Sequence, residues 1–370
     1  MLTPFDDYPI HQTPEPIAQP STGDRNFYDR YFFNGYGLSS PGGATGAEVY
    51  FAAAWGLYPN RSVADAAFSV MRGGEQISVH ASRRAPLDRV DMAVGPITIE
   101  VVEPLRRLRI VLRPNDSGIE ADLLFTNVTV AMEEPRFTRH AGSRVVMDYT
   151  RLTQFGAWEG WITVDGERIE VKPSEVVGSR DRSWGIRGVG ERDAGAPGTQ
   201  EPQFFWLWAP TSFDDACVHF DVQEDADGRR WHWNGEIAPV GGASSERAVA
   251  VDWEIDWKPG TRRAQGAAIS LTMIDGTVNR IVLEPLVDFQ MLGIGYFHPR
   301  FSHGTWLGEE AVLAERWTLA DLDPMALQHL HIQALCKATW GDRVGVGILE
   351  QLVIGRHLPS GFTELLDGAR

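Results

Sequence analysis

The amino-acid sequence predicts an all-β protein made of antiparallel strands. From Phe27 onward, apolar and polar residues alternate and turn signals recur about every ten residues, which is typical of sandwiches and barrels. Asp-Gly and Gly-Gly pairs between the apolar runs supply the positive φ angles that tight hairpins require. Because helical periodicity is scarce, crossover helices are not expected, and the sheets must close or pair to bury their apolar faces.

The chain divides into an arm and two regions of strands. Residues 1–24 carry five prolines and few paired apolar residues, which predicts an extended arm that either wraps the body or is partly loose. The Gly- and Pro-rich segment 188–202 predicts the boundary between a first β domain, residues 25–187, and a second β domain, residues 188–370.

Each hairpin is predicted from two apolar runs that flank a turn. The turns fall at Gly73-Gly74 within 67–79, at 114–118 between 97–112 and 119–130, at Asp165-Gly166 within 158–171, at 225–228 within 217–233, and at Asp275-Gly276 within 268–283. Short helices are predicted only over 308–316 and 361–369.

Composition narrows the classes of partner. The net charge of −16 argues against nucleic acid or an anionic membrane, since both attract basic surfaces. No apolar run approaches the ~18 residues of a membrane helix, and the N-terminus lacks the pattern of a signal peptide. We therefore expect a cytoplasmic protein, a monomer or homodimer, whose two cysteines, Cys217 and Cys336, are buried thiols.

The most informative segment runs from Gly178 to Gly185, with the sequence GSRDRSWG. Neighbouring residues of a strand point to opposite faces, so Asp181 and Ser183 share one face while Arg182 and Trp184 share the other. If Asp181 faces an apolar cavity, loss of water raises its pKa and it can protonate an alkene or a leaving hydroxyl. If an arginine reaches it, Asp181 is only a structural ion pair.

Tryptophans cluster on alternating positions after the boundary. Trp206 and Trp208 share one strand face, and Trp231 and Trp233 share another. Indole faces stabilise a developing carbocation by cation–π attraction, worth about 2 kcal/mol when desolvated. The alternative for each tryptophan is ordinary packing between sheets.

Two further pairs carry polar side chains on one strand face. Tyr296 and His298 could relay a proton or position water, or lie in a loop beside Pro299. His219 and Asp221 form either a dyad that faces a pocket or a solvated strand face, and the sequence slightly favours the solvated face.

The segment Val177–Gly185 resembles the Asp-His-x-Trp-Gly-type segment of the carotenoid 1,2-hydratase and AttH-like superfamily. The preceding segment Tyr149–Gly156 and the hairpin at 160–166 resemble bacterial members of the same group. The resemblance implies two lipocalin-like β domains packed together, with a hydrophobic cavity, and hydration or cyclisation of isoprenoids. Asp181 and Trp184 match the pattern, whereas Arg182 stands where the hydratase pattern has histidine.

These observations predict a cofactor-independent hydratase, dehydratase or cyclase that acts on a terpenoid- or steroid-like substrate in a cavity near the domain interface. Asp181, Tyr296 and His298 are the candidate catalytic residues. The candidate substrate-binding residues are Trp184, Trp206, Trp208, Trp231, Trp233, Arg182 and Tyr149. No metal is expected, because the His329-x-His331 pair lacks a matching carboxylate. The alternatives are a non-catalytic carrier of apolar molecules and a protein that shapes a spontaneous ring closure.

Overall fold

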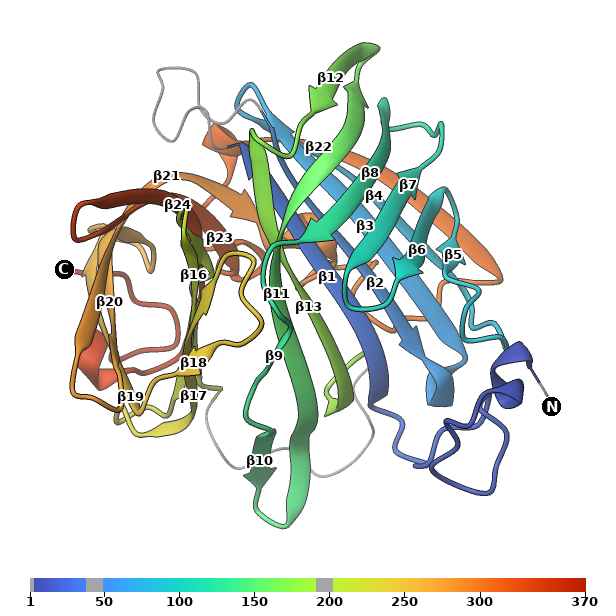
Figure 1. Cartoon of the computed structure of the whole chain (residues 1–370), viewed down its shortest axis with the longest axis horizontal. Coiled ribbons are helices and arrows are strands. Elements are labelled where there is room, and N and C mark those ends of the chain that lie inside the picture. The colour runs from blue at the N-terminus through green and yellow to red at the C-terminus, as the bar shows by residue number, and fades with distance from the viewer. Residues whose placement is uncertain (1–2, 38–48, 191–201) are drawn as a thin grey trace.

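The computed structural model describes residues 3–37, 49–190 and 202–370, which form two antiparallel sheets. Figure 1 shows the sheets side by side, the larger on the right and the smaller, C-terminal one on the left. Within the described ranges, the helical elements are 3-10 turns of three or four residues. The predicted all-β class is therefore confirmed.

Among the described residues, the first sheet contains fourteen strands, eleven of them on one continuous path. In spatial order, these are β22 (Glu310–Thr318), β4 (Glu75–Arg84), β3 (Val63–Arg72), β2 (Tyr50–Tyr58), β1 (Phe27–Gly37), β13 (Val176–Arg187), β11 (Arg144–Val164), β8 (Ile119–Asn127), β7 (Arg107–Leu112), β6 (Ile97–Glu103) and β5 (Ala93–Val94). Three short strands pair with β11 alone, namely β9 (Met132–Glu133), β10 (Phe137–Ala141) and β12 (Glu167–Val171).

The second sheet contains ten strands. In spatial order, they are β18 (Glu246–Arg247), β17 (Arg230–Pro239), β16 (Ala216–Glu224), β14 (Phe204–Trp208), β24 (Arg343–Ile354), β23 (Ile332–Trp340), β21 (Val278–Gln290), β20 (Ala264–Thr272) and β19 (Ala250–Trp257), with β15 (Thr211–Ser212) beside β16 and β24. The 3-10 turns are η1 (Pro4–Asp7), η2 (Pro59–Arg61), η3 (Met291–Ile294), η4 (Leu319–Asp321), η5 (Leu327–His329) and η6 (Leu358–Ser360).

Each sheet curls around its own core, and a third core joins the two sheets. β5 and β6 return over β3, and the apolar side chains between them fill the first sheet. In the second sheet, β17 approaches β19 around a separate core. The third core lies between the sheets and includes Tyr50, Phe289 and Trp208. Alternation along the central strands lets one strand serve two cores, because its two faces point in opposite directions.

The predicted hairpins are confirmed. β3 and β4 join at Gly73-Gly74, β11 and β12 at Asp165-Gly166, and β20 and β21 at Asp275-Gly276. The turn at 225–228 joins β16 to β17, and the one at 114–118 joins β7 to β8.

The two predicted helices are wrong. Residues 310–318 form β22, which extends the first sheet by pairing with β4, although it belongs to the second half of the chain. Residues 361–369 form no helix and follow η6 as an irregular segment. Edge pairing satisfies the backbone of β22, and this tertiary contact overrides the helix-forming tendency of its alanine, glutamate and leucine residues.

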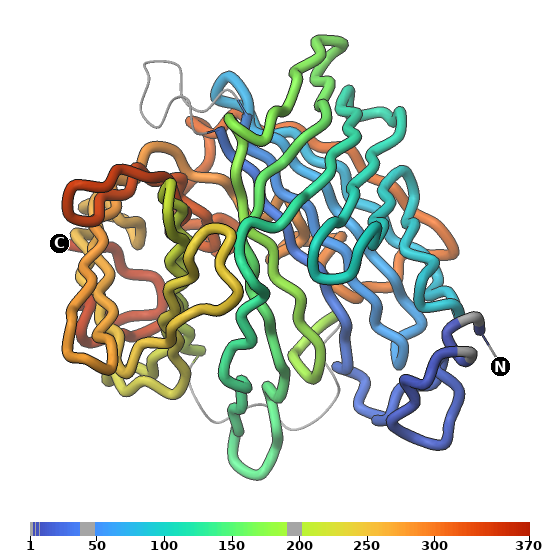
Figure 2. Tube along the Cα trace, viewed as in Figure 1, coloured from blue at the N-terminus to red at the C-terminus, as the bar shows by residue number. Residues whose placement is uncertain are grey.

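The N-terminal arm contacts the first sheet (Figure 2). Asn60 donates hydrogen bonds to the carbonyls of Thr22 and Asp24, and Arg89 donates to those of Ile17 and Ala18. Most of the predicted boundary segment lies outside the described residues, which leave out 191–201.

Both cysteines are buried and free, as predicted. None of the helices among the described residues has the length and apolar character to cross a membrane.

Candidate active site

A cavity of about 1270 Å³ lies between the two sheets. Residues of β1, β11 and β13 line it from the first sheet, residues of β14 and β24 line it from the second, and the segment after η3 completes the lining. Its place agrees with the expected cavity near the domain interface. Its chemistry differs from that expectation, because five arginines and three carboxylates line it beside the aromatic side chains.

Strand β13 places the residues of the motif on two faces. Asp181 and Ser183 line the cavity, as alternation predicts. On the other face, Arg180 donates to the side chain of Gln154, and Arg182 pairs with Asp29. Neither flanking arginine forms a hydrogen bond or ion pair with Asp181.

The Asp181 carboxyl is held in the cavity without a hydrogen-bond partner among the described residues. Burial raises its pKa to about 6, although the positive charges of Arg151 and Arg30 act in the opposite direction. A carboxyl group with this pKa is half protonated near pH 6, so it can donate a proton in one step and accept one in the next. Asp181 is therefore equipped for acid–base chemistry in this cavity.

Tyr296 reaches the cavity because the turn at η3 packs closely on the first sheet. A Cβ atom on Gly293 would lie 2.2 Å from Nε2 of Gln76, so a larger residue there would displace this side chain. Gln76 also donates to the carbonyl of Gln290 and accepts from its N–H. Gly295 then turns the chain with a φ of 100°, and Tyr296 follows with its hydroxyl 3.4 Å from Nη1 of Arg30.

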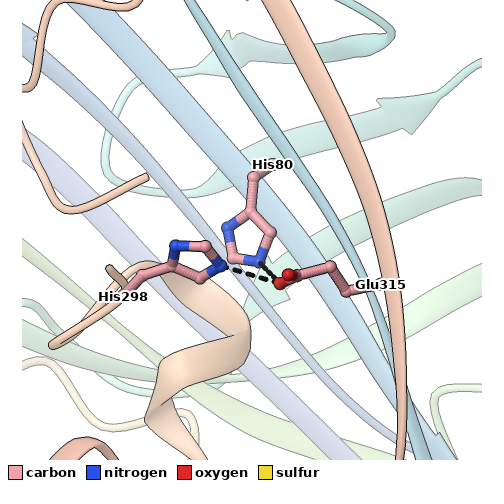
Figure 3. A group of neighbouring side chains, drawn as sticks. All are labelled: His80, His298 and Glu315. Carbon is pink, nitrogen blue, oxygen red and sulfur yellow. Dashed lines mark hydrogen bonds and ion pairs between the residues drawn. The ribbon is translucent and has the colours of Figure 1, made fainter. Parts of the chain in front are cut away.

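His298 also lines the cavity, but both ring nitrogens are engaged. Nδ1 accepts hydrogen bonds from the N–H groups of Arg300 and Phe301. Nε2 therefore carries the proton and donates to Glu315 at 2.7 Å, while Nε2 of His80 lies 3.7 Å from the same carboxylate oxygen (Figure 3). In this arrangement His298 fixes the turn after Tyr296.

The cluster of His80, His298 and Glu315 has the spacing of a metal site. Its hydrogen bonding does not suit one. A histidine that binds a metal through Nε2 ordinarily donates its Nδ1–H to an acceptor. Here Nδ1 of His298 accepts from two N–H groups, so metal binding through Nε2 would need an imidazole stripped of both protons.

A second group with metal-like spacing, Glu134, Asp221 and His232, already holds a cation. The guanidinium of Arg151 contacts both Glu134 and Asp221, so it already occupies carboxylate oxygens that a metal would need. Although burial raises the pKa of Asp221, the charge and hydrogen bond of His232, the hydrogen bond of His219 and the charge of Arg151 together hold it well below its ordinary value. The solvated face predicted for His219 and Asp221 is wrong, since both side chains are fully buried.

The predicted aromatic residues separate by strand face. Trp206, Trp208 and Tyr149 line the cavity. Phe205 and Leu207 alternate with the two tryptophans and pack in the core of the second sheet instead. Nε1 of Trp206 donates to Glu350, which fixes the indole against the cavity wall.

The remaining predicted substrate-binding residues do not line the cavity. Trp184 is 38% exposed, and Arg182 lies over the ring of Tyr31 on the opposite face of β13. Trp231 contacts Arg139, and Trp233 packs against the core of the second sheet. His232 lies between these two tryptophans and points to the opposite face, where it contacts Asp221. The prediction that Trp231 and Trp233 share a strand face is correct, but that face does not line the cavity.

Sequence reasoning missed several polar residues of the lining. Arg187 has the same parity along β13 as Asp181, so the alternation that placed Asp181 also points to it. Arg30 on β1, His331 just before β23 and Glu350 on β24 carry no comparable signal. Nε2 of His331 donates a hydrogen bond to the Glu350 carboxylate at 2.8 Å.

Solved structures with a similar fold include a putative AttH and a hydratase. A putative AttH from Nitrosomonas europaea has a TM-score of 0.56 at 14% identity, over 88% of this chain and 92% of that one. Kievitone hydratase from Nectria haematococca has a TM-score of 0.53 at 14% identity, over 88% of each chain. These matches confirm the predicted fold resemblance to the carotenoid hydratase and AttH-like proteins.

A search of curated proteins finds no match to the sequence. A family model does match it, over residues 2–363. The chain belongs to the family of unknown function DUF8625.

Proposed function

We propose that this protein is a lyase or isomerase of the hydratase, dehydratase or cyclase type, which acts by proton transfer on an apolar, terpenoid- or steroid-like molecule. The observation that carries the proposal is Asp181, a carboxyl without a hydrogen-bond partner that lines a cavity and whose pKa burial raises to about 6. An unpaired acid in such a place is typical of a catalytic group, because a structural carboxylate is paired.

The reaction begins with protonated Asp181. It donates its proton to an alkene carbon, or to a hydroxyl that leaves as water. The positive charge that develops on the substrate lies near the indoles of Trp206 and Trp208 and near the new Asp181 carboxylate, which both stabilise it. Water that adds to the cation gives up a proton to Asp181, which yields the hydrate. Loss of a neighbouring proton to Asp181 instead gives an alkene. If a second alkene of the substrate first attacks the cation, a ring closes, and the new cation then loses its proton to Asp181.

Tyr296 and Tyr149 act beside Asp181 in this proposal. The Tyr296 hydroxyl lies at the cavity wall next to Arg30, where it can hold the water that adds or leaves. Tyr149 stacks on Phe137 with 4.4 Å between ring centroids, which keeps its ring rigid at the wall. His298 supports the position of Tyr296 through the turn that both residues share.

The experiment begins with the identity of the ligand. Solvent extraction of the purified protein and mass spectrometry identify any apolar molecule that co-purifies. Incubation of that molecule with the protein then shows gain or loss of one water, or isomerisation at constant mass. We expect Asp181→Asn to lower kcat by about 10²–10⁴-fold and to leave the ligand Kd within about twofold.

Asp24→Asn is the matched control, since Asp24 lines the same cavity and its carboxylate accepts a hydrogen bond from the N–H of Asn26. Its turnover should match that of the unmodified protein. A carrier of apolar molecules would bind the ligand and never convert it. Turnover that survives Asp181→Asn would contradict acid catalysis by this residue and favour a cavity that only shapes a spontaneous ring closure.

A further inference from the structure

Two arginines of the cavity lack an acidic partner among the described residues. Arg30 is 2% exposed, and its Nη1 lies 3.4 Å from the Tyr296 hydroxyl while its Nη2 has no hydrogen-bond partner. Arg187 is partly exposed, its guanidinium forms no hydrogen bond or ion pair with the described residues, and it lies 5.0 Å from the ring centroid of Tyr28. Both side chains line the cavity.

The guanidinium of Arg30 is unusual, because a buried charge without a partner is strongly destabilising. Arg151 lines the same cavity and shows the ordinary solution, with Glu134 and Asp221 on its guanidinium. Arg144 lines the cavity too, but it is exposed, so water satisfies its charge. The buried guanidinium of Arg30 therefore indicates an anion supplied from outside the chain, and Arg187, which lines the same cavity, offers a second guanidinium to it.

We propose that Arg30 and Arg187 bind the acidic head group of the substrate, and that the substrate is an apolar molecule with a carboxylate at one end. This inference rests on the proposed function in taking the cavity as the substrate site. Guanidiniums bind carboxylates through paired, charge-assisted hydrogen bonds. The apolar remainder of the molecule would lie against Phe32, Trp208 and Leu352, which line the same cavity.

Strand register places this anion site beside the proposed acid. Arg30 on β1 lies directly opposite Ser183 on β13, and Asp181 is two residues further along the same face. Diagonal neighbours of this kind are separated by about 7–8 Å, so a head group on Arg30 leaves the adjoining carbon atoms of the substrate near Asp181.

The same geometry couples binding to the protonation of Asp181. The positive charge of Arg30 lowers the pKa of Asp181 and so opposes the effect of burial. A carboxylate bound to Arg30 offsets that charge, and the pKa of Asp181 then rises. Binding of an acidic substrate would thus favour the protonated form of Asp181 that begins the reaction.

The test compares probes that share a chain and differ in the head group. Dodecanoate, dodecyl phosphate and dodecanol are each titrated, below their micellar concentrations, against the protein loaded with the neutral dye Nile red, and displacement gives the affinity. We expect dodecanoate to bind at least about tenfold more tightly than dodecanol. Equal affinities for these two would overturn the proposal, and tight binding of dodecyl phosphate alone would overturn the assignment to a carboxylate.

Variants locate the head group. Arg187→Met should lower the affinity for dodecanoate by about 10–100-fold and leave the affinity for dodecanol within about twofold. Arg187→Lys should keep part of the preference for dodecanoate because it keeps the positive charge. Arg229→Met is the matched control, since Arg229 is exposed and lies outside the cavity lining, and it should change the affinity for neither probe. If Arg187→Met weakened both probes equally, Arg187 would be a structural residue and the proposal would fail.

The test of the anion site can fail or succeed independently of the test of acid catalysis by Asp181. Probe binding is an equilibrium measurement, and Asp181→Asn leaves both arginines in place. A preference for dodecanoate that persists in Asp181→Asn, together with unchanged turnover in that variant, would remove the catalytic role of Asp181 and keep the anion site. Loss of turnover in Asp181→Asn without any preference for dodecanoate would do the reverse.

Discussion

At the scale of single residues, environment decides what an ionisable side chain does. Asp181 and Asp221 are both aspartates on central strands with little access to bulk water. Asp221 contacts His219, His232 and Arg151, and its pKa is lowered, whereas Asp181 has no such contacts and burial raises its pKa to about 6. The first is therefore a permanent charge, and the second can exchange a proton near neutral pH.

The raised pKa of Asp181 predicts a pH-dependent gain in stability for Asp181→Asn. The folded protein holds this proton more tightly than the unfolded chain, whose aspartate titrates near 3.9, so the contribution of Asp181 to stability falls as pH rises from about 4 to about 6. Above that window the buried carboxylate is destabilising. Asp181→Asn should raise the free energy of unfolding by about 1–3 kcal/mol at pH 7.5, and the gain should vanish near pH 4.

Denaturant titrations at the two pH values measure this difference. Asp116→Asn serves as the control, because Asp116 is exposed and should give no gain at either pH. A gain for Asp181→Asn that is the same at both pH values would mean that the side-chain amide packs better, and that protonation of Asp181 is not involved.

At the scale of elements, turn residues and alternation predicted the hairpins, but partners distant in sequence decided the edges. The segment that forms β22 has helix-forming residues and an irregular apolar pattern, and only the free edge of β4 makes it a strand. The sequence around β22 does not indicate this partner, because β4 lies more than two hundred residues earlier in the chain.

The close packing of β13 against β11 leads to a prediction about stability at Gly185, the last residue of the motif. Gly185 has a φ of 138°, and a Cβ atom there would lie 2.4 Å from the carbonyl oxygen of Asp148 and 2.5 Å from Cα of Tyr149. Both contacts are with the backbone of β11, which cannot move without breaking the ladder. Gly185→Ala should lower the free energy of unfolding by about 3 kcal/mol or more.

Gly266→Ala is the matched control on β20. Its Cβ would meet only the Asp256 side chain, at 3.9 Å, so the free energy of unfolding should change by no more than about 1 kcal/mol. Thermal and urea unfolding compare the two variants. Equal stability of Gly185→Ala and the unmodified protein would show that β13 and β11 are not held this close at the motif.

At the scale of the whole molecule, an aromatic core and a buried charge network join the two sheets. Arg151 belongs to β11 of the first sheet, and it reaches Asp221 on β16 of the second sheet at 3.3 Å. The Arg151 side chain is 9% exposed, whereas those of Glu134 and Asp221 are fully buried. Arg151 therefore supplies a positive charge to two buried carboxylates.

Arg151→Met should destabilise the protein by about 3–5 kcal/mol, because it leaves two buried carboxylates without their cation. Arg109→Met is the control, since Arg109 pairs with Asp122 at the surface and a pair of that kind contributes about 1 kcal/mol or less. Urea unfolding at neutral pH gives both values. A loss in Arg151→Met no greater than that in Arg109→Met would show that the sheets do not depend on this network.

Alternation and turn residues are local properties, and they were enough to predict the all-β class, the hairpins and the face of β13 that carries Asp181. The cavity is not local. Arg30 and Tyr296 meet across it although they lie 266 positions apart, and Arg187 and Glu350 reach it from different sheets. Only the packing of one curled sheet against the other decides which strand faces enclose the cavity. For that reason Trp206 and Trp208 line it, while Trp231 and Trp233, equally plausible from their spacing, do not.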